Sequence, residues 1–373
     1  MADPARRLEL ASIRLGARRA GKVTLKQTIL FSLETLPEEA RAAFYALGAF
    51  APKPDHFIRA AAQAVAQTDA HTLALLVARN LLEKIQGPED ELALHQVLAD
   101  LACPNLPPEA LARHRDYYLA LVNQDRQAWR QIEPAYGQIR WAWPKLPESE
   151  GVLDWVWALR VYQGRRGLWR DQIVWIGRGL RVTEPQGMRK DQGTLLNNMA
   201  AVYDDIGQRQ KALELYEQVL PIRQEVGDRS GEATTLSNMA LVYDNIGQRQ
   251  KALELYGQAL PIRKEVGDRS GEAATLGNMA VVYNGIGQRQ KALELYEQAL
   301  PIQREVGDRA GESVTCYNLA QIYWGQGHLE EAVAEMRRVV ELDRQVGHRD
   351  LESDLSVLRK MEGELNIKAG KPG

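Results

Sequence analysis

The hydrophobic pattern of residues 187–346 repeats every 40 residues. Residues 227–266 and 267–306 differ at eight of forty positions, residues 187–226 keep much of the same sequence, and residues 307–346 form a weaker fourth copy. Self-similarity at a fixed period of this length is typical of a solenoid, in which each repeat contacts mainly its neighbours. A stack of repeated units is therefore expected for this part of the chain.

Each copy predicts two helices. The apolar residues of the first helix, spaced i, i+3, i+4 and i+7, are Leu236, Met239, Ala240 and Tyr243. Gly247 is expected to end this helix, and the second helix, from about Gln248, is expected to end at Gly267. Either Asp268 or Ser270 caps the next pair. Because one amphipathic pair cannot bury its apolar face alone, neighbouring copies must stack, and the short turns predict antiparallel packing within each pair.

Three prolines interrupt the pattern of the second helices. They are Pro221, Pro261 and Pro301. Proline removes a backbone hydrogen bond and clashes with the preceding turn. We therefore expect a bend in three successive second helices.

Small and aromatic residues in these repeats resemble those of the tetratricopeptide repeat (TPR) family. The matching positions are Ala240, Tyr243, Gly247, Ala252, Tyr256 and Ala259, with their equivalents forty residues to either side. The period of about forty, rather than 34, is similar to that of the longer repeats of kinesin light chains and spindle-orientation adaptors. The resemblance implies a right-handed superhelix whose concave groove, lined by the first helices, binds an extended peptide or a partner helix.

An asparagine recurs on the first helix of every copy, one residue from the buried stripe. The four are Asn198, Asn238, Asn278 and Asn318. A side-chain amide both donates and accepts, so a regular column can pair with the main chain of a bound peptide. The resemblance to the long-repeat relatives implies such a ladder. The alternative is that each asparagine bonds to the neighbouring repeat and orders the stack.

Other candidates for the groove follow the buried tyrosine and differ between copies. They are Asp204, Asp205, Asp244, Asn245 and Asn284. A lining graded from acidic to neutral would favour a basic or neutral ligand, whereas the alternative is ordinary solvated polarity at helix ends. The recurrent Arg229, Arg269 and Arg309 belong to loops between repeats, where a surface charge is the simpler interpretation.

The N-terminal region predicts a small winged-helix domain. Helices are expected on both sides of a break at Pro37, then over residues 56–67 and 72–86. Residues 81–95 turn from strand to strand around Gly87-Pro88, which predicts one β-hairpin. Helices followed by a hairpin make a winged helix.

The same region resembles the winged-helix segment of bacterial STAND signalling ATPases of the NB-ARC class. The residues that carry the resemblance are Ser32-Leu33-Glu34-Thr35-Leu36-Pro37, Leu94-His95-Gln96 and the helix of residues 113–121. In that family the histidine matched by His95 senses the phosphate of a nucleotide. However, the sequence contains no G-x-x-x-x-G-K-[ST], so nucleotide hydrolysis by this chain alone is not expected. His95 would sense a nucleotide only with a nucleotide-binding domain outside this chain, and otherwise it is an ordinary histidine at the end of the wing.

The predicted organisation has six parts. Residues 1–23 are an N-terminal linker, 24–104 the winged-helix domain, 105–150 a helical connector, 151–186 a degenerate capping helix pair, 187–346 the four repeats, and 347–373 a C-terminal capping helix and tail. The fold class is all-α, with a TPR solenoid preceded by a winged-helix domain that contains the hairpin.

Composition and charge remove several function classes. The 47 Lys and Arg residues balance 49 Asp and Glu residues, so nucleic-acid binding through bulk charge is unlikely to be the function, and no apolar run is long enough to span a bilayer. The two cysteines, Cys103 and Cys316, match neither a disulfide framework nor a metal site and favour a reducing, cytoplasmic setting. No catalytic motif, metal site or cofactor-binding motif is found, so we expect neither an enzyme nor a cofactor.

The leading hypothesis is a non-catalytic sensor module of a bacterial STAND-type signal-transduction ATPase. Its repeats would hold a protein or peptide ligand in the groove, and its winged helix would act on a nucleotide-binding domain of a longer parent protein. One alternative is a winged-helix regulator that binds DNA. The other is a self-assembling TPR scaffold, since nearly identical repeats present similar edges.

Overall fold

The computed structural model describes residues 25–85, 90–125, 129–149, 151–346, 350–368 and 370. The chain forms two compact units, residues 1–182 and residues 183–373. None of the helices within the described ranges has the length and apolar character that crossing a membrane requires.

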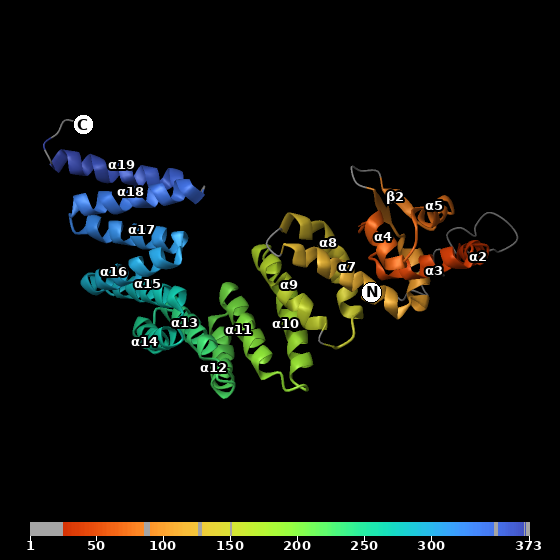
Figure 1. The fold of residues 1–373 in the computed structure, drawn as a ribbon, viewed down its shortest axis with the longest axis horizontal. Helices are drawn as coiled ribbons and strands as arrows, with labels where there is room; N and C mark the ends of the chain where they lie inside the picture. The colour runs from red at the N-terminus through yellow and green to blue at the C-terminus, as the bar shows by residue number, and fades with distance from the viewer. Residues whose placement is uncertain are drawn as a thin grey trace. The chain divides into compact units, whose positions relative to one another are not determined.

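The second unit consists of successive antiparallel helix pairs (Figure 1). The pairs are α11 (Arg189–Asp205) with α12 (Arg209–Glu225), α13 (Arg229–Asn245) with α14 (Arg249–Glu265), α15 (Arg269–Gly285) with α16 (Arg289–Val306), and α17 (Arg309–Gly325) with α18 (Leu329–Val346), followed by α19 (Leu351–Lys368). We call α11, α13, α15 and α17 the first helices and their partners the second helices. The predicted solenoid of repeated helix pairs is confirmed.

Glycines and an aspartate set the helix ends as the sequence predicts. Gly247 and Gly267 adopt φ angles of 82° and 69°, in the left-handed region that only glycine enters without strain. Of the two candidate caps, Asp268 is the N-cap of α15, where its Oδ1 accepts a hydrogen bond of 2.8 Å from the Gly271 N–H. These turns are short, so each helix must fold back on the one before it.

The apolar core is continuous from one pair to the next. Between α13 and α14, Ala233 and Leu236 pack with Ala259 and Ile262, and an equivalent cluster recurs forty residues later. The second-helix tyrosines Tyr216, Tyr256 and Tyr296 are among the largest buried side chains. Burying an aromatic side chain of this size contributes about 1.5–3 kcal/mol, so each repeat gains stability from its neighbours.

The prolines lie within the second helices, as expected. Pro221, Pro261 and Pro301 are exposed, and α12, α14 and α16 continue through them. Each proline ring therefore faces solvent, and water can hydrogen-bond to the carbonyl group of the preceding turn that lacks an N–H partner. The bend itself stays a prediction.

A polar junction joins each second helix to the next first helix. We call residues 223, 263, 303 and 343, which occupy the same place near the ends of the second helices, the junction residues. Arg223 donates to Asp228 at 2.5 Å, and Arg263 pairs with Asp268 in the same way. The glycine of the following helix leaves no room for a side chain, because a Cβ at Gly271 would lie 2.3 Å from Asp268 Oδ2 and 2.7 Å from Arg263 Cδ.

A buried carboxylate completes each junction. Glu232, Glu272 and Glu312 lie in the first turns of α13, α15 and α17. Glu272 accepts a hydrogen bond of 2.6 Å from Arg269 and lies 3.7 Å from Lys264 on the preceding helix. Each carboxylate thus links two successive repeats beside the positive end of a helix dipole. Arg229, Arg269 and Arg309, predicted to lie in loops, are the first residues of α13, α15 and α17. They also reach the end of the second helix of their own pair, as Arg269 does to Glu305 at 2.7 Å.

The first unit contains the helices and the hairpin predicted for the N-terminal region, plus a third short strand. Its elements are α2 (Leu25–Glu34), α3 (Glu38–Ala46), β1 (Phe57–Ile58), α4 (Arg59–Ala66), α5 (Ala70–Ala78), β2 (Glu83–Ile85), β3 (Glu91–Ala93), α6 (Gln96–Ala102), α7 (Pro108–Gln124), α8 (Trp129–Ala142), α9 (Gly151–Arg165) and α10 (Trp169–Thr183), with 3₁₀ turns at Leu47–Ala49, Cys103–Asn105 and Trp143–Lys145. The strands form an antiparallel sheet in the order β1-β3-β2. The predicted Gly87-Pro88 turn lies outside the described residues.

The helix expected over residues 72–86 is shorter than predicted. It ends at Ala78, and Asn80 adopts a φ angle of 56° in the left-handed region, where asparagine is tolerated better than most residues. Leu81 and Leu82 are then buried and the chain enters β2. An apolar run cannot by itself distinguish a continuing helix from a strand.

Aromatic residues form the core of the first unit. Trp143 stacks on Trp175 with ring centroids 4.0 Å apart. His114 is 1% exposed between Phe50 and Tyr118, with ring centroids 5.0 and 4.7 Å away. Burial, helped by the nearby charge of Lys145, lowers the pKa of His114 to about 3, so this histidine is a neutral core residue at physiological pH.

Two glycine substitutions within α15 test the junction. Gly271→Ala is expected to lower the free energy of unfolding by about 1–3 kcal/mol, because the new methyl group displaces the Asp268 cap and its arginine partner. Gly277→Ala meets no atom within 4 Å and should raise stability by roughly 0.5–1 kcal/mol through helix propensity. Urea denaturation followed by circular dichroism measures both, and a neutral Gly271→Ala would contradict the tight junction.

Candidate ligand-binding surface

The first helices present a common outer surface, which we call the first-helix face. It comprises the exposed and half-buried side chains of α11, α13, α15 and α17. Successive first helices, α11 with α13 and α13 with α15, approach each other more closely than successive second helices do among the described residues. A stack curves toward the side on which its elements lie closer together. The first helices therefore line the inner side of the curve.

Large apolar side chains are exposed on this face. Leu241 and Val281 occupy equivalent positions of α13 and α15 and are 44% and 45% exposed. Val314 and Tyr317 on α17 are 62% and 36% exposed. At the corresponding positions of α11, Thr194 and Asn197 are polar and Ala201 is small. On α17 the first two of these positions are apolar, whereas the third is Gln321.

The differences between the two most similar copies are concentrated on this face. The eight differing pairs are 234/274, 237/277, 241/281, 244/284, 245/285, 257/297, 263/303 and 264/304. The first five pairs lie on first helices, at positions that are exposed or half-buried, whereas Gln303 of the junction pair is buried. The core is the same in both copies while the surface changes, so the first-helix face is chemically different in each repeat.

The recurrent asparagines lie at the boundary between this face and the preceding repeat. The Asn238 amide donates a hydrogen bond of 3.4 Å to Asn197 Oδ1 on α11. Asn238 also interacts with the buried Tyr216 hydroxyl, as Asn278 does with Tyr256 and Asn318 with Tyr296. Burial raises the pKa of these tyrosines, and the amide opposes that shift.

 Although Asn278 interacts with Tyr256, it is exposed, so a ligand can also reach its side-chain amide.

The acidic and amide candidates cluster where first helices turn into second helices. Asp204 lies 3.7 Å from Arg209, and Asp244 lies 3.5 Å from Arg249, so part of their charge is balanced locally. Burial raises the pKa of Asp204, and the neighbouring Asp205 charge raises it further. The remaining candidates of this group, Asp205, Asn245 and Asn284, are exposed.

A lysine on each of three second helices covers the tyrosine that ends the preceding first helix. Lys211, Lys251 and Lys291 lie 4.2, 4.1 and 5.3 Å from the ring centroids of Tyr203, Tyr243 and Tyr283. Such cation–π contacts hold the turn between the two helices of a pair. These contacts were not predicted from the sequence, although the constant spacing of eight residues between tyrosine and lysine indicates them.

His95 belongs to the first unit, whereas the first-helix face belongs to the second. It is exposed and is the N-cap of α6, where its Nδ1 accepts a hydrogen bond of 3.3 Å from the Val97 N–H. The Gln96 amide donates to Asp100 at 2.8 Å. Gln96 is thus engaged within its own helix, and the geometry gives His95 a capping role at the end of the hairpin.

The described residues contain no group of three or more histidine, cysteine, aspartate or glutamate side chains arranged to hold a metal ion. Both cysteines are free thiols. Burial raises the pKa of the Cys316 thiol to about 12, so this sulfur is protonated at neutral pH.

A family model described as tetratricopeptide repeat matches residues 191–265 and again residues 271–345. The helix pairs α11–α18 are tetratricopeptide repeats. The identification made from the small and aromatic positions of each copy is confirmed for this part of the chain. No curated protein matches the sequence.

Several solved structures are similar to the chain. The apo form of the quorum sensor NprR from B. thuringiensis is 18% identical, with 70% of this chain and 72% of that chain covered and a TM-score of 0.54. NprR in complex with its cognate peptide NprX is 20% identical, with 68% and 75% covered and a TM-score of 0.50. A STAND protein with a tetratricopeptide repeat sensor, PH0952 from Pyrococcus horikoshii, is 13% identical, with 98% and 69% covered and a TM-score of 0.49. The likeness to NprR shows a common fold.

The asparagine contacts lead to a stability prediction. Asn238→Ala combined with Asn278→Ala should lower the free energy of unfolding by about 1 kcal/mol per site, because each buried tyrosine hydroxyl loses an amide partner. Asn284→Ala, at an exposed position near the end of α15, is the control and should change stability little. The free energies of unfolding of the wild-type protein, the double variant and the Asn284→Ala control are measured by urea denaturation. An unchanged midpoint in the double variant would show that the asparagines do not order the stack.

Proposed function

We propose that the repeats bind a peptide or protein partner along the first-helix face and that this chain performs no covalent chemistry. The observation that carries the proposal is that the exposed Leu241 and Val281 lie on the same face as most of the side chains that differ between otherwise similar repeats. Contiguous exposed apolar side chains on a soluble domain mark an interaction surface. The side chains that differ between otherwise similar repeats lie on the same face, which suits recognition of a ligand whose chemistry changes along its length.

The proposed surface combines apolar contacts with amide groups. The exposed Leu241, Val281 and Tyr317 would contact side chains of the ligand. The asparagine column, Asn198, Asn238, Asn278 and Asn318, would pair with its main chain, and Asp204, Asp205, Asp244, Asn245 and Asn284 would border its edge. An extended peptide fits this arrangement because its main-chain groups recur at regular spacing. The complex of NprR with its cognate peptide NprX supports a peptide ligand for this fold.

We further propose that the chain is the sensor part of a bacterial STAND-type ATPase in the cytoplasm. The order of α3, β1, α4, α5, β2 and β3, with a three-stranded antiparallel sheet, supports a winged helix in the first unit. The sequence resemblance around Pro37 and His95 supports the STAND class. The exposed His95 would then meet a nucleotide-binding domain of a longer parent protein. Ligand binding would signal only if it favours one of two states of that domain.

A peptide selection tests binding on the first-helix face. The immobilised chain is used to enrich a random 12-residue phage-displayed library, and the dissociation constant of an enriched, fluorescein-labelled peptide is measured by fluorescence polarisation. Leu241→Gln combined with Val281→Gln is expected to weaken binding at least ten-fold, because two apolar contacts are lost.

The matched control moves the same chemical change to the second helices. Val266 and Val306 are 40% and 41% exposed, close to the exposure of Leu241 and Val281, but they lie at the ends of α14 and α16. Val266→Gln combined with Val306→Gln should leave the dissociation constant unchanged. Failure to enrich any peptide, or equal losses in the two double variants, would count against the proposal.

A further inference from the structure

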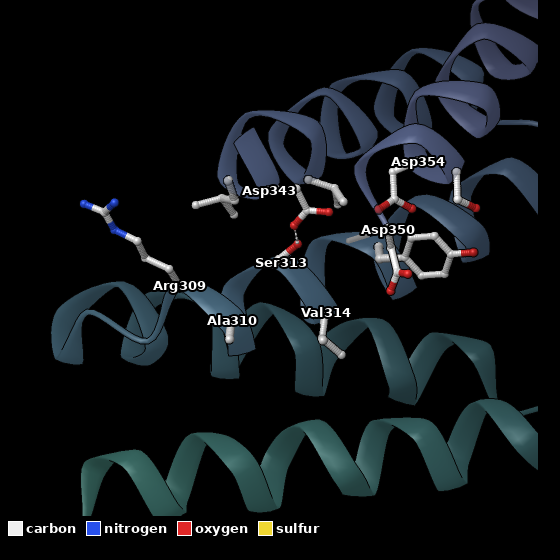
Figure 2. Close-up of a pocket in the computed structure, with 11 residues that line it drawn as sticks. Arg309, Ala310, Ser313, Val314, Asp343, Asp350 and Asp354 are labelled. Atoms are coloured by element: carbon white, nitrogen blue, oxygen red, sulfur yellow. Dashed lines mark hydrogen bonds between the residues drawn. The ribbon is translucent and has the colours of Figure 1, made fainter. Parts of the chain in front are cut away.

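A pocket of about 440 Å³ lies at the C-terminal end of the repeats, between α17, α18 and α19. Figure 2 shows Ala310, Ser313 and Val314 on α17, opposite carboxylates that come from α18, from the residue before α19 and from α19. The carboxylates belong to Asp343, Asp350 and Asp354. The volume falls within the roughly 300–1,000 Å³ of small-molecule sites.

The place of Asp343 is occupied by arginine in the first two repeats and by Gln303 in the third. Asp343 is the junction residue of the fourth repeat, and its counterparts in the first and second repeats are Arg223 and Arg263. The Arg223 guanidinium donates to Thr194 Oγ1 at 3.1 Å and to Asp228 at 2.5 Å. It therefore fills the space between the second helix and the two neighbouring first helices.

The fourth repeat replaces this cation by a shorter anion. Asp343 is 4% exposed, and its Oδ1 accepts a hydrogen bond of 2.9 Å from the Ser313 hydroxyl. Val314 stands where Thr194 contacts the arginine in the first repeat. Asp343 and Val314 both line the pocket, and the charge at the junction position is opposite in sign to that of the first two repeats.

We propose that this pocket binds a guanidinium group supplied by a ligand, in the place that Arg223 fills in the first repeat. The Asp343 carboxylate at the base would accept hydrogen bonds from the planar group, and Asp350 and Asp354, just before and within α19, would add negative charge. The apolar Tyr317 and Leu342 would contact the methylene stem of an arginine side chain.

The pocket is continuous with the first-helix face. Val314 and Tyr317 line the pocket and are also exposed on α17. A peptide on the first-helix face could therefore place an arginine in the pocket at the α17 end. This extension to a peptide rests on the proposed function, whereas the preference of the pocket for a guanidinium group does not.

The direct test compares two small probes on the full chain by isothermal titration calorimetry. N-acetyl-arginine amide is expected to bind at least ten-fold more tightly than N-acetyl-citrulline amide, which has nearly the same shape but no charge. Asp343→Asn should remove this preference. Glu254→Gln, which makes the same change of charge at an exposed position of α14, should retain it.

A second variant keeps the test decisive if Asp343→Asn does not fold. Val314 is 62% exposed, so Val314→Trp can narrow the mouth of the pocket without altering a carboxylate or the core. It should weaken binding of the arginine probe at least ten-fold with an unchanged melting temperature. Equal binding of the two probes, no binding of either, or undiminished binding to Val314→Trp would overturn the proposal.

The sequences of the peptides enriched from the phage library show whether a peptide supplies the guanidinium group. Arginine near one end of those peptides, lost when selection is repeated on Val314→Trp, would support an arginine carried by a peptide. Binding of the small probe alone would support the pocket and contradict its extension to a peptide. Peptides that bind without arginine, together with no binding of the small probe, would contradict the pocket while the proposed function stands.

Discussion

The buried junction between each second helix and the following first helix is the constraint on which the solenoid depends. At the second junction, Asp268 caps α15, Arg263 packs over the cap, and Gly271 leaves the space that both require. Glu272 then links Arg269 to Lys264 across the boundary. The Glu272 carboxylate and the Arg263 guanidinium are largely buried, whereas Arg269 and Lys264 are about half exposed. A shift of one repeat against the next would therefore leave chiefly the buried Glu272 carboxylate without its partners, which is unfavourable. The junction thereby fixes the spacing and orientation of successive pairs.

This division of roles leaves one side of the stack free for recognition. The core residues and the junctions bind repeat to repeat, and the first-helix face is needed for neither. Leu241 and Val281 are exposed there, as are Val314 and Tyr317 on α17, whereas the core residues Leu236 and Leu276 of the same helices are buried. The same reasoning accounts for the pocket beside Asp343. The junction arginine is replaced by Gln303 in the third repeat and by Asp343 in the fourth, where Leu351 also stands in place of the glycine and a pocket lies beside Asp343.

Much of the fold follows from sequence, because its determinants are local and repeated. The 40-residue period, the apolar stripes and the turns at Gly247 and Gly267 predict the helix pairs without any long-range information. The end of the helix at Ala78 was missed because the apolar Leu81 and Leu82 continue the helical pattern into a strand. Local periodicity does not contain the packing that separates those two outcomes.

The candidate surface was only partly predictable. The asparagine column is visible in the sequence, but its contact with the tyrosines of the preceding repeat depends on how repeats pack, as Asn278 and Tyr256 show. Likewise, Asp343 looks like an ordinary polar residue near a helix end. The sequence does not show that Asp343 lines a pocket, nor that its counterpart Arg223 contacts Thr194 on the paired helix.

The most direct test of the account is a crystal structure of the full chain bound to a peptide that it selects. The account predicts that the peptide crosses the first helices and contacts Leu241 and Val281, while the junctions at Gly271 and Asp268 stay as they are in the free protein. A peptide seated on the ends of the second helices near Val266, with the first-helix face empty, would contradict it.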